Sequence, residues 1–231
     1  MLVIGIIACQ SRRKLSETAV GRARKMGERL MRKKATPERL GAFSDGVIAV
    51  IITIMVLELK APHTASPGAL LALWPTFASY ALSYLFVGTV WINHHHLLRY
   101  TDTATPAVIW SNLACLFTVS LIPFFTAYMA ENRMAPFTTA MYAAEFLLVS
   151  ITFHIFQLSI TGQFENDPEL EAKAEAGSRK NLTAMSLYTL AIPAAYLHPS
   201  VSFALIFGVG VMYFFPEAKA KRDTQGGGVI S

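Results

Sequence analysis

The chain has 231 residues, of which 53% are hydrophobic and 15% are charged, and its mean hydropathy is +0.42. Soluble domains usually carry about a quarter charged residues. This composition excludes a disordered chain, a coiled coil and a disulfide scaffold, and it argues against an ordinary cytosolic enzyme. Two cysteines, Cys9 and Cys115, provide neither a cystine framework nor a zinc ligand set. The composition therefore predicts an all-α polytopic membrane protein.

The net charge of +5 is concentrated at the start of the chain. Residues 1–39 contain eleven of the twenty Lys and Arg residues against three glutamates, so the remainder is net acidic. No aromatic residue is interleaved with these cations for base stacking, which argues against nucleic-acid binding. Residues 1–35 are therefore predicted to be a basic cytoplasmic arm, attracted to anionic lipid of the bilayer.

The first nine residues form a short apolar run whose end resembles a lipoprotein cleavage box at Cys9. The basic stretch follows this run instead of preceding it, which is the wrong order for a secretory signal. We expect a gene start called too early, with Met26 or Met31 as the initiator. Residues 1–9 are left out of the expected fold.

Six apolar runs approach the roughly 20 residues that a membrane-spanning helix requires. They cover residues 40–59, 70–98, 107–129, 137–160, 182–197 and 201–215. The first run is preceded by a helix start signal: a capping Thr36, Pro37 in the first turn and Glu38 at the positive end of the helix dipole. The last two runs are shorter, so a tilted or re-entrant hairpin is the alternative for them.

These six runs predict a six-span domain over residues 36–216, followed by a flexible, Gly-rich cytoplasmic tail over residues 217–231. The longest connection between spans is the acidic, helix-prone segment 161–180. With both termini in the cytoplasm, eighteen Lys and Arg residues lie inside and two, Lys60 and Arg133, lie outside. The positive-inside rule therefore predicts a multi-pass protein of the cell inner membrane with both termini cytoplasmic.

Four residues of the first span share one helical face: Val50, Thr53, Ile54 and Leu57 follow the spacing i, i+3, i+4 and i+7. Asp45 lies about 140° from Val50 at 100° per residue, so it is expected to face neighbouring helices. An ionisable residue inside a span is a functional candidate. Asp45 is either anchored near the inner interface by an Arg or His of another helix or a direct ligand of an ion. From spacing alone, the stripe indicates no more than helix packing.

Three consecutive histidines, His94, His95 and His96, end the second run. Consecutive helical side chains point about 100° apart, so the three cannot converge on one metal ion, and we expect no metal site. The favoured interpretation is a hydrogen-bonded network at the inner end of this span, with Asp45, Asn93 and Asn112.

Several enzyme signatures are absent from the sequence. It contains no Gly-rich phosphate loop, no Gly-x-Ser-x-Gly elbow and no His-Glu-x-x-His. The Thr-Val-Gly-Tyr-Gly filter of ordinary potassium channels is missing as well. We therefore expect neither an enzyme nor a resident cofactor. If the chain conducts ions, we expect its ion path to differ chemically from that filter.

Four spaced motifs carry a family resemblance. Residues 39–45, RLGAFSD, match the pattern Arg-x-x-x-Phe-Ser-Asp at the start of the first span, and Trp91-x-x-His94-His95 ends the second. The third span contains Asn112-Leu113 and the pattern Leu121-x-Pro123-Phe124-x-Thr126. These motifs resemble the bacterial branch of the lysosomal/endosomal potassium channel family, over about residues 36–160.

The resemblance implies a potassium-preferring cation channel with passive conduction. Bacterial members of this family look like homotetramers in which the first helix of each subunit lines a central pore. Carried over by motif, Val50 forms a hydrophobic constriction, Thr53 forms a hydroxyl ring, and Ile54 and Leu57 form further apolar layers. Val50 is smaller than the Ile or Leu usual in relatives, which makes the constriction less tight. The permeant partner is K⁺.

The resemblance also implies a group of residues that holds the pore helix. The residues of this network are Arg39, Phe43, Ser44, Asp45, Trp91, His94 and Asn112. No span carries a series of Arg residues, so we expect no voltage sensing.

Two other classes of function stay open at this point. A proton-coupled secondary transporter, or a proton-leak pathway, would use Asp45, Glu145 or His154 as the titrating group. A non-conducting membrane scaffold would recruit partners through the basic arm and the acidic segment. Neither inverted repeats nor broken helices, which are frequent in transporters, are evident in the sequence.

Overall fold

The computed structural model describes residues 37–101, 103–163 and 168–214, and these residues form helices and no strands. This confirms the all-α prediction. The predicted arm (residues 1–35), the capping Thr36 and the predicted tail (residues 217–231) lie outside the described residues. The helices are α2 (Pro37–Leu57), α3 (Pro67–Leu71), α4 (Trp74–Leu98), α5 (Pro106–Glu131), α6 (Pro136–Thr161), α7 (Pro168–Leu197) and α8 (Pro199–Phe214).

Proline marks the start of almost every helix. Six of the seven described helices begin at a proline, and α4 has Pro75 as its second residue. Proline suits the first turn because its missing N–H is not needed there and its φ is already helical. Capping side chains support two of these starts: the Oγ of Ser66 accepts from the N–H of Ala69, and the Oγ1 of Thr105 accepts from that of Val108.

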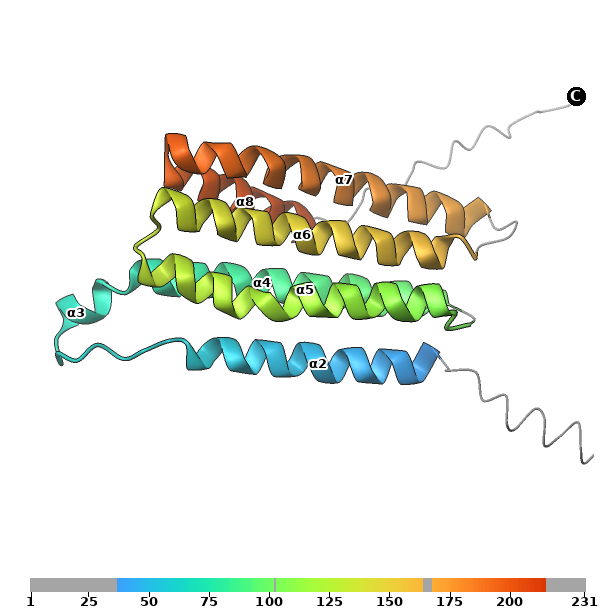
Figure 1. Cartoon of the computed structure of the whole chain (residues 1–231), viewed down its shortest axis with the longest axis horizontal. Helices are drawn as coiled ribbons and strands as arrows, with labels where there is room; N and C mark the ends of the chain where they lie inside the picture. The colour runs from blue at the N-terminus through green and yellow to red at the C-terminus, as the bar shows by residue number, and fades with distance from the viewer. Residues whose placement is uncertain (1–36, 102, 164–167, 215–231) are drawn as a thin grey trace, which may run out of the picture.

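The six long helices run side by side in one bundle, with α3 as a short turn at one end (Figure 1). Successive helices run in opposite directions, so the connections alternate between the two ends. The α5–α6 and α6–α7 pairs pack most extensively, whereas α2 packs mainly against α4 and α5. The first helix therefore lies at the edge of the bundle.

Two helix boundaries differ from the predicted ones. The first helix ends at Leu57 instead of residue 59, and the predicted run over residues 70–98 is divided between α3 and α4. The division has a clear cause, since Pro75 has no N–H to bond to the carbonyl of Leu71, four residues earlier. The chain therefore ends one helix at Leu71 and starts another at Trp74.

The segment predicted as a connection between spans is largely helical. Helix α7 runs without interruption from Pro168 to Leu197, so the acidic stretch forms its first turns. Alanine, glutamate and lysine have high helix propensity, and acids near a helix N-terminus interact favourably with the helix dipole. An ion pair between Arg179 and Glu175, at 2.9 Å and one turn apart, adds to this segment.

Hydroxyl pairs join the central helices. Ser111 bonds to Ser159 at 2.9 Å and Thr118 to Thr152 at 2.8 Å, both between α5 and α6. Small residues and interhelical hydrogen bonds are typical of helix packing inside membranes, where no hydrophobic driving force operates between helices.

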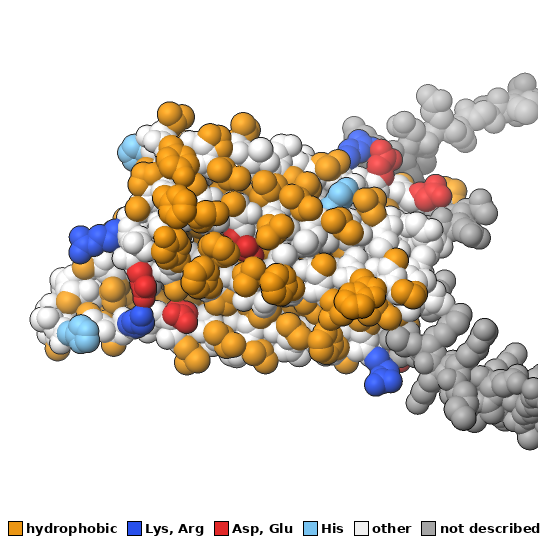
Figure 2. Space-filling model, viewed as in Figure 1, with side chains coloured by type: hydrophobic (Ala, Val, Ile, Leu, Met, Phe, Trp, Pro, Cys, Tyr) orange, Lys and Arg blue, Asp and Glu red, His pale blue; other side chains and the backbone are white. Residues whose placement is uncertain are grey.

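Three described helices, α2, α5 and α6, are long and apolar enough to cross a membrane, and α8 is a shorter apolar helix. On the face in view, hydrophobic side chains cover the middle of the bundle and charged ones gather mostly toward the two ends (Figure 2). This distribution matches a protein with an apolar bilayer around its middle.

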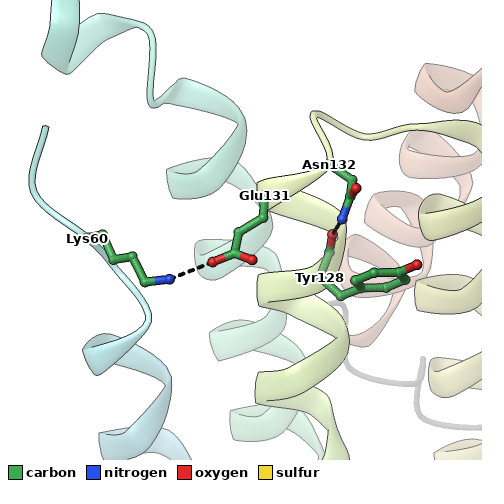
Figure 3. A network of polar contacts seen from close by, with 4 residues as sticks. All are labelled: Lys60, Tyr128, Glu131 and Asn132. Atoms are coloured by element: carbon green, nitrogen blue, oxygen red, sulfur yellow. Dashed lines mark hydrogen bonds and ion pairs between the residues drawn. The ribbon is translucent and has the colours of Figure 1, made fainter.

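An ion pair joins the segment just after α2 to the end of α5. The Nζ of Lys60, just after α2, donates to the Oε1 of Glu131 at the end of α5, 2.6 Å away, and the side chain of Asn132 bonds to the carbonyl of Tyr128 beside it (Figure 3). The hydrogen bond to Glu131 raises the pKa of Lys60 above its ordinary value. The Lys60 side chain therefore stays charged at neutral pH, but both side chains of the pair are mostly exposed, so the pair contributes little to stability.

Candidate pore helix and its polar support

Helix α2 has two different faces. One face is buried against α4 and α5. The residues of this face are Leu40, Ser44, Ile48, Ile51 and Met55. They follow the helical spacing i, i+4, i+8, i+11 and i+15, so the helix buries one continuous stripe.

The opposite face of α2 is open. It carries Val50, Thr53, Ile54 and Leu57, and the exposed fractions are 54% for Val50, 43% for Ile54 and 75% for Leu57. Thr53 is exposed too, and its hydroxyl donates to the carbonyl of Val50, 2.8 Å away. A hydroxyl that donates to its own helix keeps its oxygen lone pairs free to accept. The stripe predicted from the helical spacing is thus an apolar surface that carries one side-chain oxygen, the hydroxyl of Thr53.

A groove runs along this open face, between α2 and α5. It has a volume of about 910 Å³ and is lined by apolar residues of both helices, including Phe43, Val50 and Ile54 from α2 and Phe124 from α5. Glu58 and Glu131 lie at its end. A contiguous exposed apolar surface of this kind is typical of a protein–protein or lipid contact.

Three buried polar side chains connect α2, α4 and α5. The Nδ2 of Asn112 donates to the Oγ of Ser44 at 3.1 Å, and the Oγ of Ser44 donates to the carbonyl of Leu40 at 2.9 Å. The Oδ1 of Asn112 is 2.6 Å from the Nε2 of His94. Each of the three side chains is at most 1% exposed. Because the amide oxygen Oδ1 of Asn112 can only accept, the Nε2 of His94 must carry the proton in this hydrogen bond. The bond therefore selects the tautomer of His94.

Asp45 belongs to a second contact between α2 and α4. Its Oδ1 accepts from the Nε1–H of Trp91, 2.8 Å away. The ring of Trp91 stacks on that of His95 at 5.8 Å, and His95 and Asp45 both line an open cavity beside the start of α2. Asp45 is thus directed at a neighbouring helix, away from the Val50 stripe.

The other residues of the expected network lie elsewhere. Arg39 and Phe43 are on the exposed face of α2, and within the described chain no hydrogen bond joins either of them to Asp45, Ser44 or Asn112. Their positions follow the spacing of the open stripe, since Phe43 precedes Val50 by seven residues. The side chain of Asn93 bonds to the carbonyl of Thr89 on its own helix, apart from His94.

The remaining ionisable candidates are on α6. Glu145 is buried, and its Oε1 has no hydrogen-bond partner within the described chain. His154 is half-buried nine residues further on, which places it about 180° around the helix. Among the described residues, His, Cys, Asp and Glu side chains form no group of three able to hold a metal ion.

Sequence reasoning missed a second buried polar cluster. The Oγ of Ser83 bonds to the Oγ1 of Thr126 and to the hydroxyl of Tyr142, each at 2.7 Å, which joins α4, α5 and α6. Thr126 is part of a motif of the family resemblance, but nothing in the sequence pairs it with Ser83 or Tyr142. The cluster lies at the other end of the membrane-spanning region from Asn112, so the two groups fix α4 against α5 at two levels.

The Trp91–Asp45 bond gives a direct test of how α2 is held. We expect Trp91→Phe to lower the free energy of unfolding by about 1 kcal/mol, because the ring stays but the donor to a partly exposed carboxylate is lost. Thermal unfolding of the purified protein in detergent measures this. Trp110→Phe is the matched control, since Trp110 is 72% exposed on α5, and its unfolding temperature should not change. Equal effects of the two substitutions would contradict the proposed contribution of the bond.

The fold and the site define a helical multi-pass membrane protein whose first helix presents an open stripe. Residues 39–123 match the family model described as the endosomal/lysosomal potassium channel TMEM175. A potassium channel of Chryseobacterium sp. (strain P1-3) is 31% identical over 190 residues, which is 82% of this chain and 98% of that protein. The chain therefore belongs to the TMEM175 family, a family of channels and not of enzymes.

Two further relatives support the assignment. The crystal structure of a lysosomal potassium-selective channel TMEM175 homologue from Chamaesiphon minutus superposes with a TM-score of 0.70 and 26% identity, covering 77% of this chain and 96% of that one. The human endosomal/lysosomal proton channel TMEM175 is 28% identical over 201 residues, covering 78% of this chain and 39% of the human protein. The relatives of this chain are thus named for two different ions.

Proposed function

We propose that this chain is a potassium-preferring cation channel that conducts passively through a homotetrameric pore lined by α2. The observation that carries the proposal is the open stripe of Val50, Thr53, Ile54 and Leu57 on a helix whose other face is anchored in the bundle. A stripe that no other described helix of the same chain covers is suited to face a symmetry axis. The bacterial relatives described above are named potassium channels.

In the proposed tetramer, four copies of α2 surround the axis and four Thr53 hydroxyls form a ring between apolar layers. The orientation of the Thr53 hydroxyl favours this role, because its lone pairs are available to replace water around a cation. Val50 is the proposed hydrophobic constriction, and Ile54 and Leu57 the apolar layers nearer the other mouth. Such a ring discriminates less strongly than a cage of carbonyls, so we expect a moderate preference for potassium.

The proposed setting is a bacterial inner membrane that α2, α4, α5, α6, α7 and α8 all cross. Lys60 and Arg133, the two cations expected outside, lie in connections at one end of the bundle, whereas Arg99 and the start of α7 lie at the other end. This separation is the one that the positive-inside rule requires for both termini in the cytoplasm. The basic arm is proposed to contact anionic lipid on that side.

The reversal potential tests the proposal. Purified protein in planar bilayers, with potassium chloride on one side and sodium chloride on the other, should give a current that reverses at a potential marking potassium preference. Reversal near zero with large currents would indicate a non-selective cation pore. Absence of current from well-folded tetramers would contradict channel function and favour the scaffold alternative.

Proton permeation, in place of or beside potassium flux, is the second candidate function. The human relative is named a proton channel, and Glu145 is a buried carboxyl with an unpartnered oxygen in the described chain. A pH gradient at symmetrical potassium distinguishes the two functions, since a proton path shifts the reversal potential toward the proton equilibrium potential. Saturating flux with a fixed proton stoichiometry would instead identify a carrier.

The size of Val50 predicts how the constriction responds to substitution. We expect Val50→Leu to lower the single-channel conductance at least about twofold, because four added methylene groups narrow the pore and strengthen dewetting. Val56→Leu is the control and should leave the conductance unchanged. It makes the same change at another exposed position of α2, which lies about 120° around the helix from Val50. Single-channel recording in symmetrical potassium chloride measures both. Equal conductances of Val50→Leu and the unmodified protein would show that Val50 does not form the constriction.

A further inference from the structure

An open cavity lies beside the start of α2. It is bounded by the first turns of α2 and by the end of α4, which meet at the same end of the bundle (Figure 1). Its volume is about 630 Å³, which is within the usual range of ligand sites. None of the four residues of the open α2 stripe lines it, so this cavity is distinct from the proposed pore surface.

The α2 wall of the cavity carries two acids with two small residues between them. Glu38, Gly41, Ala42 and Asp45 all line the cavity, and they follow the spacing i, i+3, i+4 and i+7 of one helical face. The two acids are therefore separated by roughly 10.5 Å along the helix axis at 1.5 Å per residue. Because Gly41 and Ala42 have no side chain beyond a methyl group, the surface between the carboxylates is unobstructed.

Both carboxylates have oxygens available to a ligand. Glu38 is exposed, and within the described chain no hydrogen bond or ion pair engages its side chain. Asp45 is half-buried, and its Oδ1 accepts from the Nε1–H of Trp91 at 2.8 Å. The second oxygen of Asp45 has no described donor, so it keeps its lone pairs free to accept.

A buried hydroxyl without a partner belongs to the opposite wall. Thr101, just after α4, lines the cavity and is 6% exposed. Its Oγ1 has no hydrogen-bond partner within the described chain. Burial of an unpaired hydroxyl costs free energy, so a ligand that supplies a donor to Thr101 gains affinity from it.

The charges of the wall favour a ligand with separated positive charges. Two acids face one cation, Arg99, which is exposed at the end of α4. The positive end of the α2 dipole and the negative end of the α4 dipole meet here, so their effects offset each other. His95 also lines the cavity, but the described His, Asp and Glu side chains form no group of three able to hold one metal ion. The two carboxylates are therefore better suited to two cationic groups than to a single ion.

We propose that this cavity binds an extended aliphatic cation with two or more protonated amines, a diamine or polyamine. Each carboxylate accepts from one ammonium group, and the hydroxyl of Thr101 accepts a further N–H. Ammonium groups only donate, and these three side chains supply acceptors. The methylene chain of the ligand lies over Gly41 and Ala42, beside Leu98. This binding does not depend on the proposed ion conduction.

Isothermal titration calorimetry on the full-length protein in an uncharged detergent at neutral pH tests the proposal. The probes are 1,8-diaminooctane, 1,3-diaminopropane and 1,8-octanediol. We expect 1,8-diaminooctane to bind most tightly. The shorter diamine has the same charge but cannot reach both acids, so it should bind up to about fivefold more weakly, the contribution of one partly exposed ion pair. The diol has the same length without charge and should bind more weakly still.

Variants of the cavity wall locate the binding. Glu38→Gln removes an exposed charge and should weaken binding of 1,8-diaminooctane up to about fivefold. Asp45→Asn removes the second charge but keeps an oxygen that can accept from Trp91, and together the two substitutions should weaken binding about tenfold. Thr101→Val, which keeps the shape of the side chain, should weaken it about threefold to tenfold through the lost acceptor.

Two further variants separate a specific site from general attraction. Glu58→Gln is the matched control, because Glu58 is an exposed acid at the other end of α2 and does not line this cavity. It should leave the affinity unchanged. Arg99→Gln removes the cation that opposes the ligand and should strengthen binding. The basic arm is present in every variant, so its cations compete equally throughout.

Three outcomes would overturn the proposal. Equal affinities for the long and the short diamine would show that the spacing of the acids is not read, and equal affinities for the diamine and the diol would show that charge is not. An unchanged affinity in Glu38→Gln, or an equal loss in Glu58→Gln, would place binding elsewhere. Glu38 is exposed and lies in the first turn of α2, so its substitution keeps the test decisive even if Asp45→Asn or Thr101→Val fails to fold.

Discussion

Replacement of Thr53 by alanine is expected to lower the potassium-to-sodium permeability ratio about threefold to tenfold, since a hydrogen-bonding group of this kind contributes about 0.5–1.5 kcal/mol net. The hydroxyl supplies the outward oxygen of the α2 stripe, and alanine offers nothing to replace water around a partly dehydrated ion. Thr53 is exposed, so the substitution leaves no cavity in the core. The reversal potential under potassium chloride against sodium chloride measures the ratio.

Two controls accompany this experiment. Thr53→Ser keeps the hydroxyl and should keep the ratio. Thr189→Ala removes an exposed hydroxyl that bonds to its own helix in the same way, at 2.8 Å from the carbonyl of Met185, but on α7. It should have no effect on selectivity. An unchanged ratio in Thr53→Ala would exclude Thr53 as the selective position and leave the constriction as the remaining candidate.

Replacement of Asn112 by alanine is expected to lower the free energy of unfolding by about 2–4 kcal/mol, because two buried partners lose their hydrogen bonds at once. Asn112 is fully buried and connects Ser44 on α2 with His94 on α4. Without it, the Nε2–H of His94 has no acceptor in this group. The anchored face of α2 is then loosened, so a smaller current per molecule is expected as well.

Thermal unfolding of the purified protein in detergent, followed by intrinsic fluorescence, measures the change. Asn93→Ala is the matched control, because the side chain of Asn93 donates to the carbonyl of Thr89 on its own helix and joins no second helix. Its cost should stay below about 1 kcal/mol. Similar losses in the two variants would show that the connection among α2, α4 and α5 does not depend on Asn112.

Local sequence signals predicted the helices because they act over a few residues. Pro37 marks a helix start that the structure has at the same position. The same local chemistry explains two of the three differences from the predicted helices: Pro75 divides a continuous apolar run, and strong helix formers after Pro168 extend α7 into the acidic segment. Hydropathy alone detects neither effect, because both depend on backbone chemistry.

The seven residues of the expected network illustrate what local signals cannot supply. Ser44, His94 and Asn112 form one buried group, Asp45 and Trp91 form a separate contact, and Arg39 and Phe43 lie on the open face. The angular separation of Asp45 from Val50 could be worked out from the helical period. The partner of Asp45 could not, because a period describes one helix and says nothing of which helix lies beside it.

The amino-acid sequence by itself determined the membrane class, the all-helical fold and the stripe of Val50, Thr53, Ile54 and Leu57, since hydropathy and the 3.6-residue period are properties of single segments. The tertiary structure decided that this stripe stays open, that Asn112 connects three helices, and that Asp45 and Thr101 line a shared cavity. Those features depend on contacts between residues far apart in the chain, as between Ser44 and Asn112, and such contacts arise when helices pack against one another.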